Sequence, residues 1–315
     1  MRLINSLLIG LMIAISLAGC ALKEKKNAEN ASVTPAKPAL KKLEPVMPPV
    51  LMTNPQDRAG FIITHYWDKF DFRDTMYCHA PDITEDAFSN FINFFPYATY
   101  NKVSEAIKKL LDSAEVDAVM YNYFIRTAEH YLFDPNSPAR NDEYYIPFLE
   151  HIVASKNVVD ESKIRPQFLL QIAYRNRPGA KAEDIVYTTA AGRTGRLYNI
   201  TARYVLVMFF NPDCKECKET TNRLKSSPVI ASAVSSGRLK VLAVYPDEQL
   251  DIWRSHLDEI PATWINGYDK ALTLRNNHIY DLKAIPTLYL LDENKNVILK
   301  DTSTGHIHDF LEKNP

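Results

Sequence analysis

Cysteine is scarce in this sequence, and basic residues hold no surplus over acidic ones. Four cysteines in 315 residues are too few to form the disulfide scaffold of a protein of this length. The formal net charge is −1 at pH 7 and charges of both signs are mixed along the chain, which argues against nucleic acid as a partner. The hydrophobic content of 46% is typical of a globular protein, and the length favours two domains plus tails.

The apolar run at the N-terminus is also short. Residues 3–17 are too few for a confident membrane span but suit the core of a signal peptide. The order Leu-Ala-Gly-Cys at positions 17–20 resembles the bacterial lipobox, in which the cysteine is diacylated and becomes the mature N-terminus. The resemblance implies a lipoprotein signal peptide over residues 1–20 with Cys20 as the lipidated residue. The alternative is an ordinary secretory signal with an incidental cysteine.

Lipidation implies a location in the cell envelope, because several acyl chains bury enough methylene groups for stable anchoring. Ala21 rather than aspartate follows the cysteine, and by resemblance to Gram-negative sorting this favours a lipid anchor in the outer membrane, with the chain facing the periplasm. Residues 21–52 are rich in lysine and proline and lack apolar periodicity. We therefore predict a flexible tether that holds the folded part away from the bilayer.

Residues 53–177 have the apolar spacing of helices. Val103, Ile107 and Leu110 recur at helical intervals, while Asp82 and Glu85 have the spacing of a capping box that opens a helix. No strand pattern alternates with these segments, so we expect a separate all-α domain. Its many aromatic residues are interpreted as core rather than as a ligand groove.

A continuous apolar run at residues 204–210 predicts a strand buried on both faces of an α/β sheet. Asn211 and Pro212 end the run, and Cys214 and Cys217 follow as a Cys-x-x-Cys before a segment of helical composition. This order is typical of thiol–disulfide exchange, because the positive end of a helix dipole favours the attacking thiolate. A purely structural disulfide is the alternative, although so small a loop constrains the unfolded chain little.

Other strand patterns complete a second domain over residues 178–315. Its further predicted strands are, in chain order, residues 185–188, 195–198, 239–245, 288–291 and 297–299. The helical segment between the two buried strands at 204–210 and 239–245 indicates a right-handed βαβ unit.

These features resemble the thioredoxin-like superfamily over about residues 179–315, and within it the membrane-anchored branch of thiol–disulfide oxidoreductases. The whole chain resembles lipoproteins of Bacteroidales that join a helical domain of unknown function to a thioredoxin fold. The resemblance implies an α/β thioredoxin-like fold, a central mixed sheet flanked by helices, after the all-α domain.

The resemblance also assigns roles by position. Cys214 matches the nucleophilic cysteine and Cys217 the resolving one. Pro286 matches the cis-proline beside the disulfide, which in the family keeps the preceding residue, here Ile285, in an extended pose that pairs with the backbone of the substrate.

Four positions near the pair depart from thioredoxin or modify its electrostatics. Asp213 stands where thioredoxins usually have tryptophan, and its carboxylate is expected to disfavour the Cys214 thiolate. Lys215 opposes that effect, and Glu216 opposes Lys215. Met208 replaces the buried acidic proton acceptor, so a proton relay has to come from elsewhere, with Glu219 and Asp247 as candidates.

The favoured function is a thiol–disulfide oxidoreductase, acting as a reductant on protein disulfides and reduced again by a membrane-embedded thiol donor. Neither a cofactor nor a metal is expected. Cys78 and His79 are interpreted as packed side chains; a resolving thiol, or zinc ligands beside Cys214 and Cys217, are the alternatives. Two further alternatives are a partner-binding helical protein with a silent thioredoxin scaffold and a peroxiredoxin-like peroxidase. Asn211 disfavours the peroxidase, since it replaces the threonine of Thr-x-x-Cys.

Overall fold

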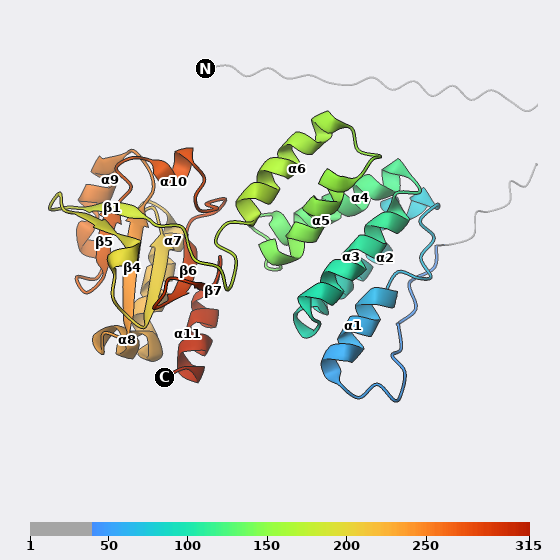
Figure 1. The fold of residues 1–315 in the computed structure, drawn as a ribbon, viewed down its shortest axis with the longest axis horizontal. Helices are drawn as coiled ribbons and strands as arrows, with labels where there is room; N and C mark the ends of the chain where they lie inside the picture. The colour runs from blue at the N-terminus through green and yellow to red at the C-terminus, as the bar shows by residue number, and fades with distance from the viewer. Residues whose placement is uncertain (1–39) are drawn as a thin grey trace, which may run out of the picture. The chain divides into compact units, whose positions relative to one another are not determined.

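The structure is a computed structural model, and it describes residues 40–315. The predicted signal peptide, its lipidation residue Cys20 and residues 21–39 of the predicted tether lie outside the described residues. Residues 40–315 form one compact unit, in which a helical region precedes a mixed β-sheet (Figure 1). We refer to residues 40–177 as the helical region. No helix in residues 40–315 has both the length and the apolar character needed to cross a bilayer.

Six α-helices make up most of the helical region, which confirms the all-α prediction for this part of the chain. They are α1 (Pro55–His65), α2 (Pro81–Asn93), α3 (Tyr100–Ala114), α4 (Ala118–Ala128), α5 (Asp142–Ala154) and α6 (Asp160–Ala173). Short 3₁₀ turns precede α2 and α3, and α4 continues into a π-helical turn over residues 129–133.

Aromatic side chains fill the core of the helical region. Phe124 of α4 is fully buried and its ring contacts those of Trp67, Phe70 and Phe88. The apolar stripe of α3 at Val103, Ile107, Leu110 and Leu111 is buried against the same core. Each large side chain that is fully buried contributes about 1.5–3 kcal/mol of transfer free energy, so this core stabilises helices that would be marginal alone. The interpretation of the aromatics as core is confirmed.

The start of α2 differs from the predicted capping box. The helix begins at Pro81 after Ala80, which offers no side-chain cap, and Asp82 lies in the first turn. Proline suits the first helical position because it has no N–H to satisfy and its φ is already helical. The capping-box prediction was wrong because the helix begins before Asp82, which therefore lies inside the first turn, and the backbone N–H of Ile83 is bound by the carbonyl of Ala80 at 2.9 Å.

The predicted tether is docked at its C-terminal end. The backbone N–H of Lys41 donates to the Tyr77 hydroxyl, which in turn donates to the carbonyl of Lys41, both at 3.2 Å. Leu43 packs on the aromatic core, and Glu44 pairs with Lys69. These contacts hold the stretch on the helical region, and a pattern based on lysine and proline content does not reveal them.

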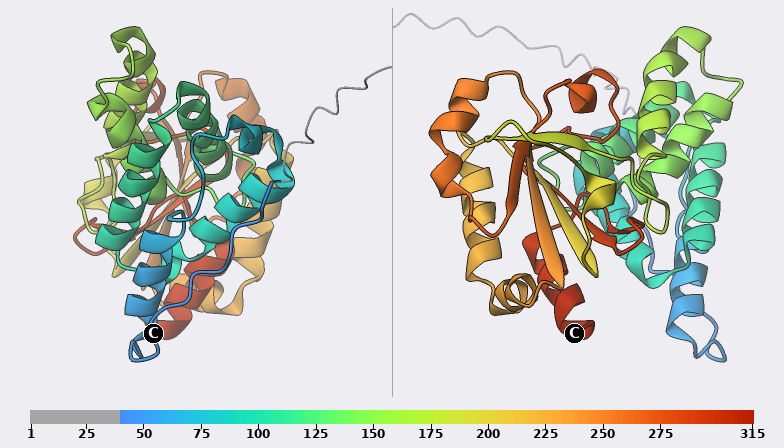
Figure 2. Two further views of the ribbon diagram at one scale, coloured as in Figure 1. Left: turned by 90° about the vertical axis from the view of Figure 1, so that its right-hand side faces the viewer. Right: turned by 60° about the vertical axis from the view of Figure 1, so that its left-hand side comes forward.

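The sheet has seven strands in the order β2-β1-β5-β4-β3-β6-β7. They are β1 (Val186–Thr189), β2 (Thr194–Arg196), β3 (Tyr204–Phe209), β4 (Leu239–Tyr245), β5 (Ile265–Tyr268), β6 (Thr287–Asp292) and β7 (Val297–Leu299). Strands β3, β4 and β5 are parallel, and the remaining pairs are antiparallel. The helices of this half are α7 (Lys215–Ser226), α8 (Pro228–Ser235), α9 (Leu250–Ser255), α10 (Thr273–Asn276) and α11 (Thr304–Lys313). The predicted thioredoxin-like fold with a mixed central sheet is confirmed (Figure 2).

Alternate side chains of β3 lie on opposite faces of the sheet, and all six residues are buried. Leu206 and Met208 pack with residues of α7, α8, α9 and α11 on one face. Val205, Val207 and Phe209 pack on the other face against α10 and the segments around β1. The continuous apolar run is explained by this burial on both sides.

Strand β5 has no counterpart among the predicted strands. Its sequence, Ile-Asn-Gly-Tyr, is poor in β-branched residues, and tertiary contacts select it. A Cβ atom on Gly267 would lie 2.9 Å from the Tyr187 ring, so only glycine fits there. The amide oxygen of Asn266 accepts a 2.9 Å hydrogen bond from the indole of buried Trp253.

Replacement of Phe124 by alanine tests the aromatic core. Because this ring is fully buried, Phe124→Ala is expected to lower the free energy of unfolding by about 3–5 kcal/mol, measured by denaturant titration. Val119→Ala on the same helix is the control, since Val119 is 52% exposed and its loss is expected to change stability little. Equal effects of the two substitutions would contradict this account of the core.

Candidate functional site

The two halves of the candidate site meet because β3 and β6 are antiparallel. Their register places Phe209, the last residue of β3, opposite Thr287, the first residue of β6. The chain that follows β3 and the chain that precedes β6 therefore lie at the same end of the sheet. The first carries the Cys-x-x-Cys, and the second carries the Ile285–Pro286 peptide bond, which is cis.

Asn211 builds the turn that leads into α7. Its side-chain oxygen accepts the backbone N–H of Asp213 at 2.9 Å, and its carbonyl accepts the backbone N–H of Cys214 at 3.0 Å. This is the local hydrogen bonding that makes asparagine a favoured turn residue. The sequence interpretation used Asn211 as the end of a strand and as an argument against a peroxidase, and did not identify this turn, although asparagine before a helix is a recognisable turn signal.

Cys214 occupies the N-cap position of α7 and is half-buried. Its sulfur accepts the backbone N–H of Cys217 at 3.4 Å. It also lies 3.5 Å from the carbonyl oxygen of Ile285, to which the thiol donates. A backbone N–H of the first turn, a backbone carbonyl and the N-terminus of α7 therefore all meet at the sulfur of the more accessible cysteine.

Cys217 differs from Cys214 in its exposure. It lies in the first turn of α7 and is 1% exposed, with its sulfur accepting the backbone N–H of Asn211 at 3.4 Å. Burial raises the pKa of the Cys217 thiol well above its ordinary value, and the neighbouring Cys214 and Glu216 act in the same direction. Cys217 is therefore a protonated thiol at neutral pH, held directly behind the more accessible sulfur.

The three charged residues expected to modulate the pair are at the surface. Lys215 reaches Glu219 at 3.6 Å with its own side chain 92% exposed, and Glu216 pairs with Arg223. Asp213 has His256 as a neighbour, 3.9 Å from its carboxylate. Exposed pairs of this kind interact weakly because water and salt screen them. The modulating roles of Asp213, Lys215 and Glu216 stay predictions.

The buried carboxylate of thioredoxin has no replacement at position 208. Met208 is fully buried on the same face of the sheet as Cys217. Glu219, one of the two candidate proton acceptors, pairs with Lys215 and Arg223 on α7. The other, Asp247, accepts a long hydrogen bond of 3.5 Å from the side chain of Asn211, the residue whose backbone N–H binds Cys217.

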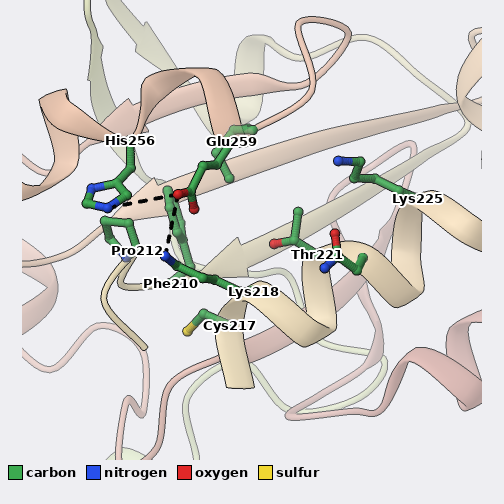
Figure 3. Close-up of a pocket in the computed structure, with 10 residues that line it drawn as sticks. Phe210, Pro212, Cys217, Lys218, Thr221, Lys225, His256 and Glu259 are labelled. Carbon is green, nitrogen blue, oxygen red and sulfur yellow. Dashed lines mark hydrogen bonds and ion pairs between the residues drawn. The ribbon is translucent and has the colours of Figure 1, made fainter. Parts of the chain in front are cut away.

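A pocket of about 270 Å³ opens beside Cys217, between α7 and the segment after α9 (Figure 3). Cys217, Phe210 and Ile260 line it, together with charged groups at its edge. Glu259 pairs with Lys218 at 3.4 Å and lies 3.9 Å from the imidazole of His256. The pocket brings polar groups next to a buried sulfur, and the sequence interpretation did not identify it.

Cys78 and His79 lie in the helical region, apart from the Cys-x-x-Cys. The sulfur of Cys78 is 3.8 Å from that of Met120, and burial raises the pKa of its thiol. Both residues line a pocket whose other walls come from α2, α4 and the π-helical turn. Within residues 40–315, no cluster of three or more histidine, cysteine or acidic side chains has the arrangement of a metal site.

Comparisons with known proteins agree with both halves of the chain. A family model described as a domain of unknown function (DUF5106) matches residues 18–176, and one described as thioredoxin-like matches residues 202–297. No curated protein matches the sequence.

Solved structures from Bacteroides resemble the chain. A thioredoxin-like protein from Bacteroides caccae ATCC 43185 is 43% identical, with a TM-score of 0.84, over 88% of this chain and 100% of that one. The C-terminal domain of an uncharacterized protein from Bacteroides fragilis NCTC 9343 is 47% identical over 44% of this chain and 98% of that one, with a TM-score of 0.43. On the extent of the first match and of the family models, this chain belongs to the family that joins a DUF5106 domain to a thioredoxin-like domain.

Proposed function

We propose that the protein is a thiol–disulfide oxidoreductase that reduces protein disulfides through Cys214 and Cys217. One observation carries the proposal: a half-exposed thiol at a helix N-cap lies 3.5 Å from the Ile285 carbonyl, and a second thiol is buried behind it. An accessible nucleophile needs a neighbouring resolving thiol to release a covalently bound substrate. The two cysteines differ in exposure in the way that this division of labour requires.

In the first step the Cys214 thiolate attacks one sulfur of a substrate disulfide. The substrate S–S bond breaks, a mixed disulfide forms between Cys214 and the substrate, and the departing substrate sulfur leaves as a thiolate that takes up a proton. The N–H of Cys217 lies 3.4 Å from the attacking sulfur and stabilises its charge before attack.

In the second step Cys217 loses its proton and attacks the sulfur of Cys214. The mixed disulfide breaks, the second substrate thiol is released, and a Cys214–Cys217 disulfide forms. The substrate has then gained two electrons and two protons, and the protein has lost the same number. Burial keeps Cys217 protonated until this step, which protects the free enzyme from reacting at the wrong sulfur.

Ile285 and Pro286 are the proposed substrate-binding residues. The Ile285 carbonyl faces Cys214, and the backbone after Pro286 leads directly into β6. A substrate segment that lies along this backbone would bring its disulfide to the Cys214 sulfur, in the manner of a strand added to an exposed edge.

The proposal extends to location and to the source of electrons. Cys20, in its lipobox-like context, would anchor the chain to the outer membrane with the folded part in the periplasm. In that compartment glutathione does not set the redox poise, and a membrane thiol donor would supply two electrons to reduce the Cys214–Cys217 disulfide again. A reductant is favoured over an oxidant by the family resemblance alone.

Cys214→Ser is expected to abolish the acceleration that the protein gives to the reduction of insulin by dithiothreitol. Serine cannot form the mixed disulfide, and buried Cys217 cannot replace the missing nucleophile because its thiol stays protonated. Cys78→Ser is the matched control and is expected to keep the wild-type rate, since Cys78 lies in the helical region. Inactivity of the wild-type protein would refute the proposed activity, and a slow Cys78→Ser variant would assign that thiol a part in it.

Cys217→Ser is expected to accumulate mixed disulfides when incubated with an extract of envelope proteins. The substrate would remain attached to Cys214 because no thiol is in position to release it. The adducts are detected on non-reducing gels and identified by mass spectrometry. The Cys214→Ser/Cys217→Ser double variant is the control, and adducts of equal abundance in both would show that the trapped bond does not involve Cys214.

Cys20→Ala is expected to move the protein from the detergent phase to the aqueous phase in a phase-partition experiment on expressing cells. Stable anchoring takes more than one acyl chain. Mass spectrometry of the wild-type N-terminal peptide should therefore detect several acyl chains on it. Cys78→Ser should partition as the wild type does. A wild-type protein found unacylated in the aqueous phase would contradict the proposed anchor.

A further inference from the structure

The segment that carries Ile285 and Pro286 is bound by the helical region near both of its ends. This segment, residues 277–286, connects α10 to β6 and is called the α10–β6 loop below. It belongs to the thioredoxin-like half of the chain, yet contacts from α5, α6 and the turn after α6 meet it at both ends.

At the start of the α10–β6 loop, the turn after α6 binds three successive backbone carbonyls. The Arg175 guanidinium donates to the carbonyl oxygens of Asn277 and His278, at 2.8 and 3.1 Å. The side chain of Asn176 donates to the Ile279 carbonyl at 2.7 Å, and its oxygen accepts the backbone N–H of Glu183 at 2.7 Å. Asn176 is buried and adopts a left-handed conformation, with φ 51°.

At the end of the loop, a buried ion pair joins it to α5. The ammonium of Lys283 donates to the carboxylate of Asp142 at 2.6 Å and pairs with Asp281 at 2.8 Å. The side chains of Lys283 and Asp142 are 10% and 5% exposed. The Lys283 ammonium also lies 4.3 Å from the centre of the Phe133 ring, an aromatic residue of the helical region.

Asp142 has a second cation beside it. Lys300 lies 3.1 Å from its other carboxylate oxygen and donates to the backbone carbonyls of Ala173 and Arg175. Burial alone raises the pKa of Asp142, but the two ammonium groups outweigh it and hold that pKa below its ordinary value. The carboxylate is therefore charged and paired on both sides, so that moving Lys283 away would leave charge without a partner in a dry environment.

The connection between Lys283, the last residue of the loop that binds the helical region, and β6 is short. Only Ala284, Ile285 and Pro286 separate Lys283 from Thr287, the first residue that pairs with β3. The Thr287 hydroxyl donates to the Ala284 carbonyl at 2.5 Å and shortens the free stretch further. A displacement of Lys283 must then be taken up by the residues that face Cys214, because consecutive Cα atoms are held 3.8 Å apart.

We propose that the helical region is a working part of the redox site, with Asp142 and Lys283 as a positioning pair that holds Ile285 in place for protein substrates. The proposal rests on the proposed function. Neither residue reacts; both act through the position of the α10–β6 loop. A protein disulfide, which has to align its backbone along the loop, depends on this pair, whereas a small disulfide that meets only the Cys214 sulfur does not.

Lys283→Met tests the pair, because methionine is a long apolar side chain without the charge and leaves Asp142 paired with Lys300. We expect kcat/KM for reduced enzyme with a protein disulfide to fall about tenfold, mainly through KM, since a small misplacement of a binding group is costly. The rate at which Cys214 reacts with a small aromatic disulfide reagent should stay within about twofold of the wild type. Lys283→Arg should restore most of the loss by keeping the charge.

Arg140→Met is the matched control. Arg140 of the helical region pairs with Asp301, which follows β7, at 2.8 Å, so this substitution also removes a partly buried cation between the two halves. Its hydrogen bonds go to the carbonyl of Pro135 and to Asp301 rather than to the α10–β6 loop, and its loss should leave the KM for the protein disulfide unchanged. Asn176→Gly provides a second test: glycine tolerates the positive φ, the bonds to Ile279 and Glu183 are lost, and KM should rise.

Hydrogen exchange of the Lys283 amide, which donates to Asp281 at 3.2 Å, and of the Thr287 amide at the start of β6 gives a readout that does not require activity. These amides should exchange faster in Lys283→Met than in the wild type and should be unaffected in Arg140→Met. Equal KM and equal exchange in the two variants would overturn the positioning role, as would an equal loss with the small disulfide. If the wild-type protein reduces no protein disulfide while the exchange result holds, the proposed function fails and the structural part of the inference stands.

Discussion

Backbone hydrogen bonds between β3 and β6 bring together two parts of the chain that are about seventy residues apart. The pairing of Phe209 with Thr287 determines that the turn holding Cys214 and the peptide bond before β6 lie at one end of the sheet. Because β3 is packed on both faces, a slip in its register would force every side chain into the close-packed layer on the opposite face. The 3.5 Å contact between the Cys214 sulfur and the Ile285 carbonyl depends on that register.

The chemistry available at this end of the sheet follows from unequal burial of two identical side chains. Cys214 is at the helix N-cap, where a backbone donor reaches its sulfur, while Cys217 is one turn further into the apolar layer with Met208. Burial of Cys217 disfavours its charged form, whereas Cys214 lies at the helix terminus and is only partly buried. In the proposed cycle Cys214 attacks and Cys217 resolves, and neither step uses a cofactor.

Residues of the helical region also contact the segment that leads to Ile285. Arg175 binds backbone carbonyls at the start of the α10–β6 loop, and Asp142 binds Lys283, two residues before Ile285. A buried ion pair contributes less to stability than its short distances suggest, but it strongly disfavours the arrangements in which one partner is left alone. Such a pair is better suited to holding a loop in one position than to stabilising the protein as a whole.

The sequence alone determined the elements with strong local signals. The apolar run of β3, the Cys-x-x-Cys at the start of α7, the α3 stripe and the thioredoxin-like class all depend on patterns within a few residues. Other features depend on contacts between residues that are distant in the sequence. They are the start of α2, the docking of Leu43, strand β5, the pocket beside Cys217 and the bonds from the helical region to the α10–β6 loop. Gly267 and Asn266 illustrate the reason: nothing local favours a strand there, and the Tyr187 ring and the Trp253 indole decide it. Periodicity records which face of an element is buried, but only the tertiary structure decides which side chain it is buried against.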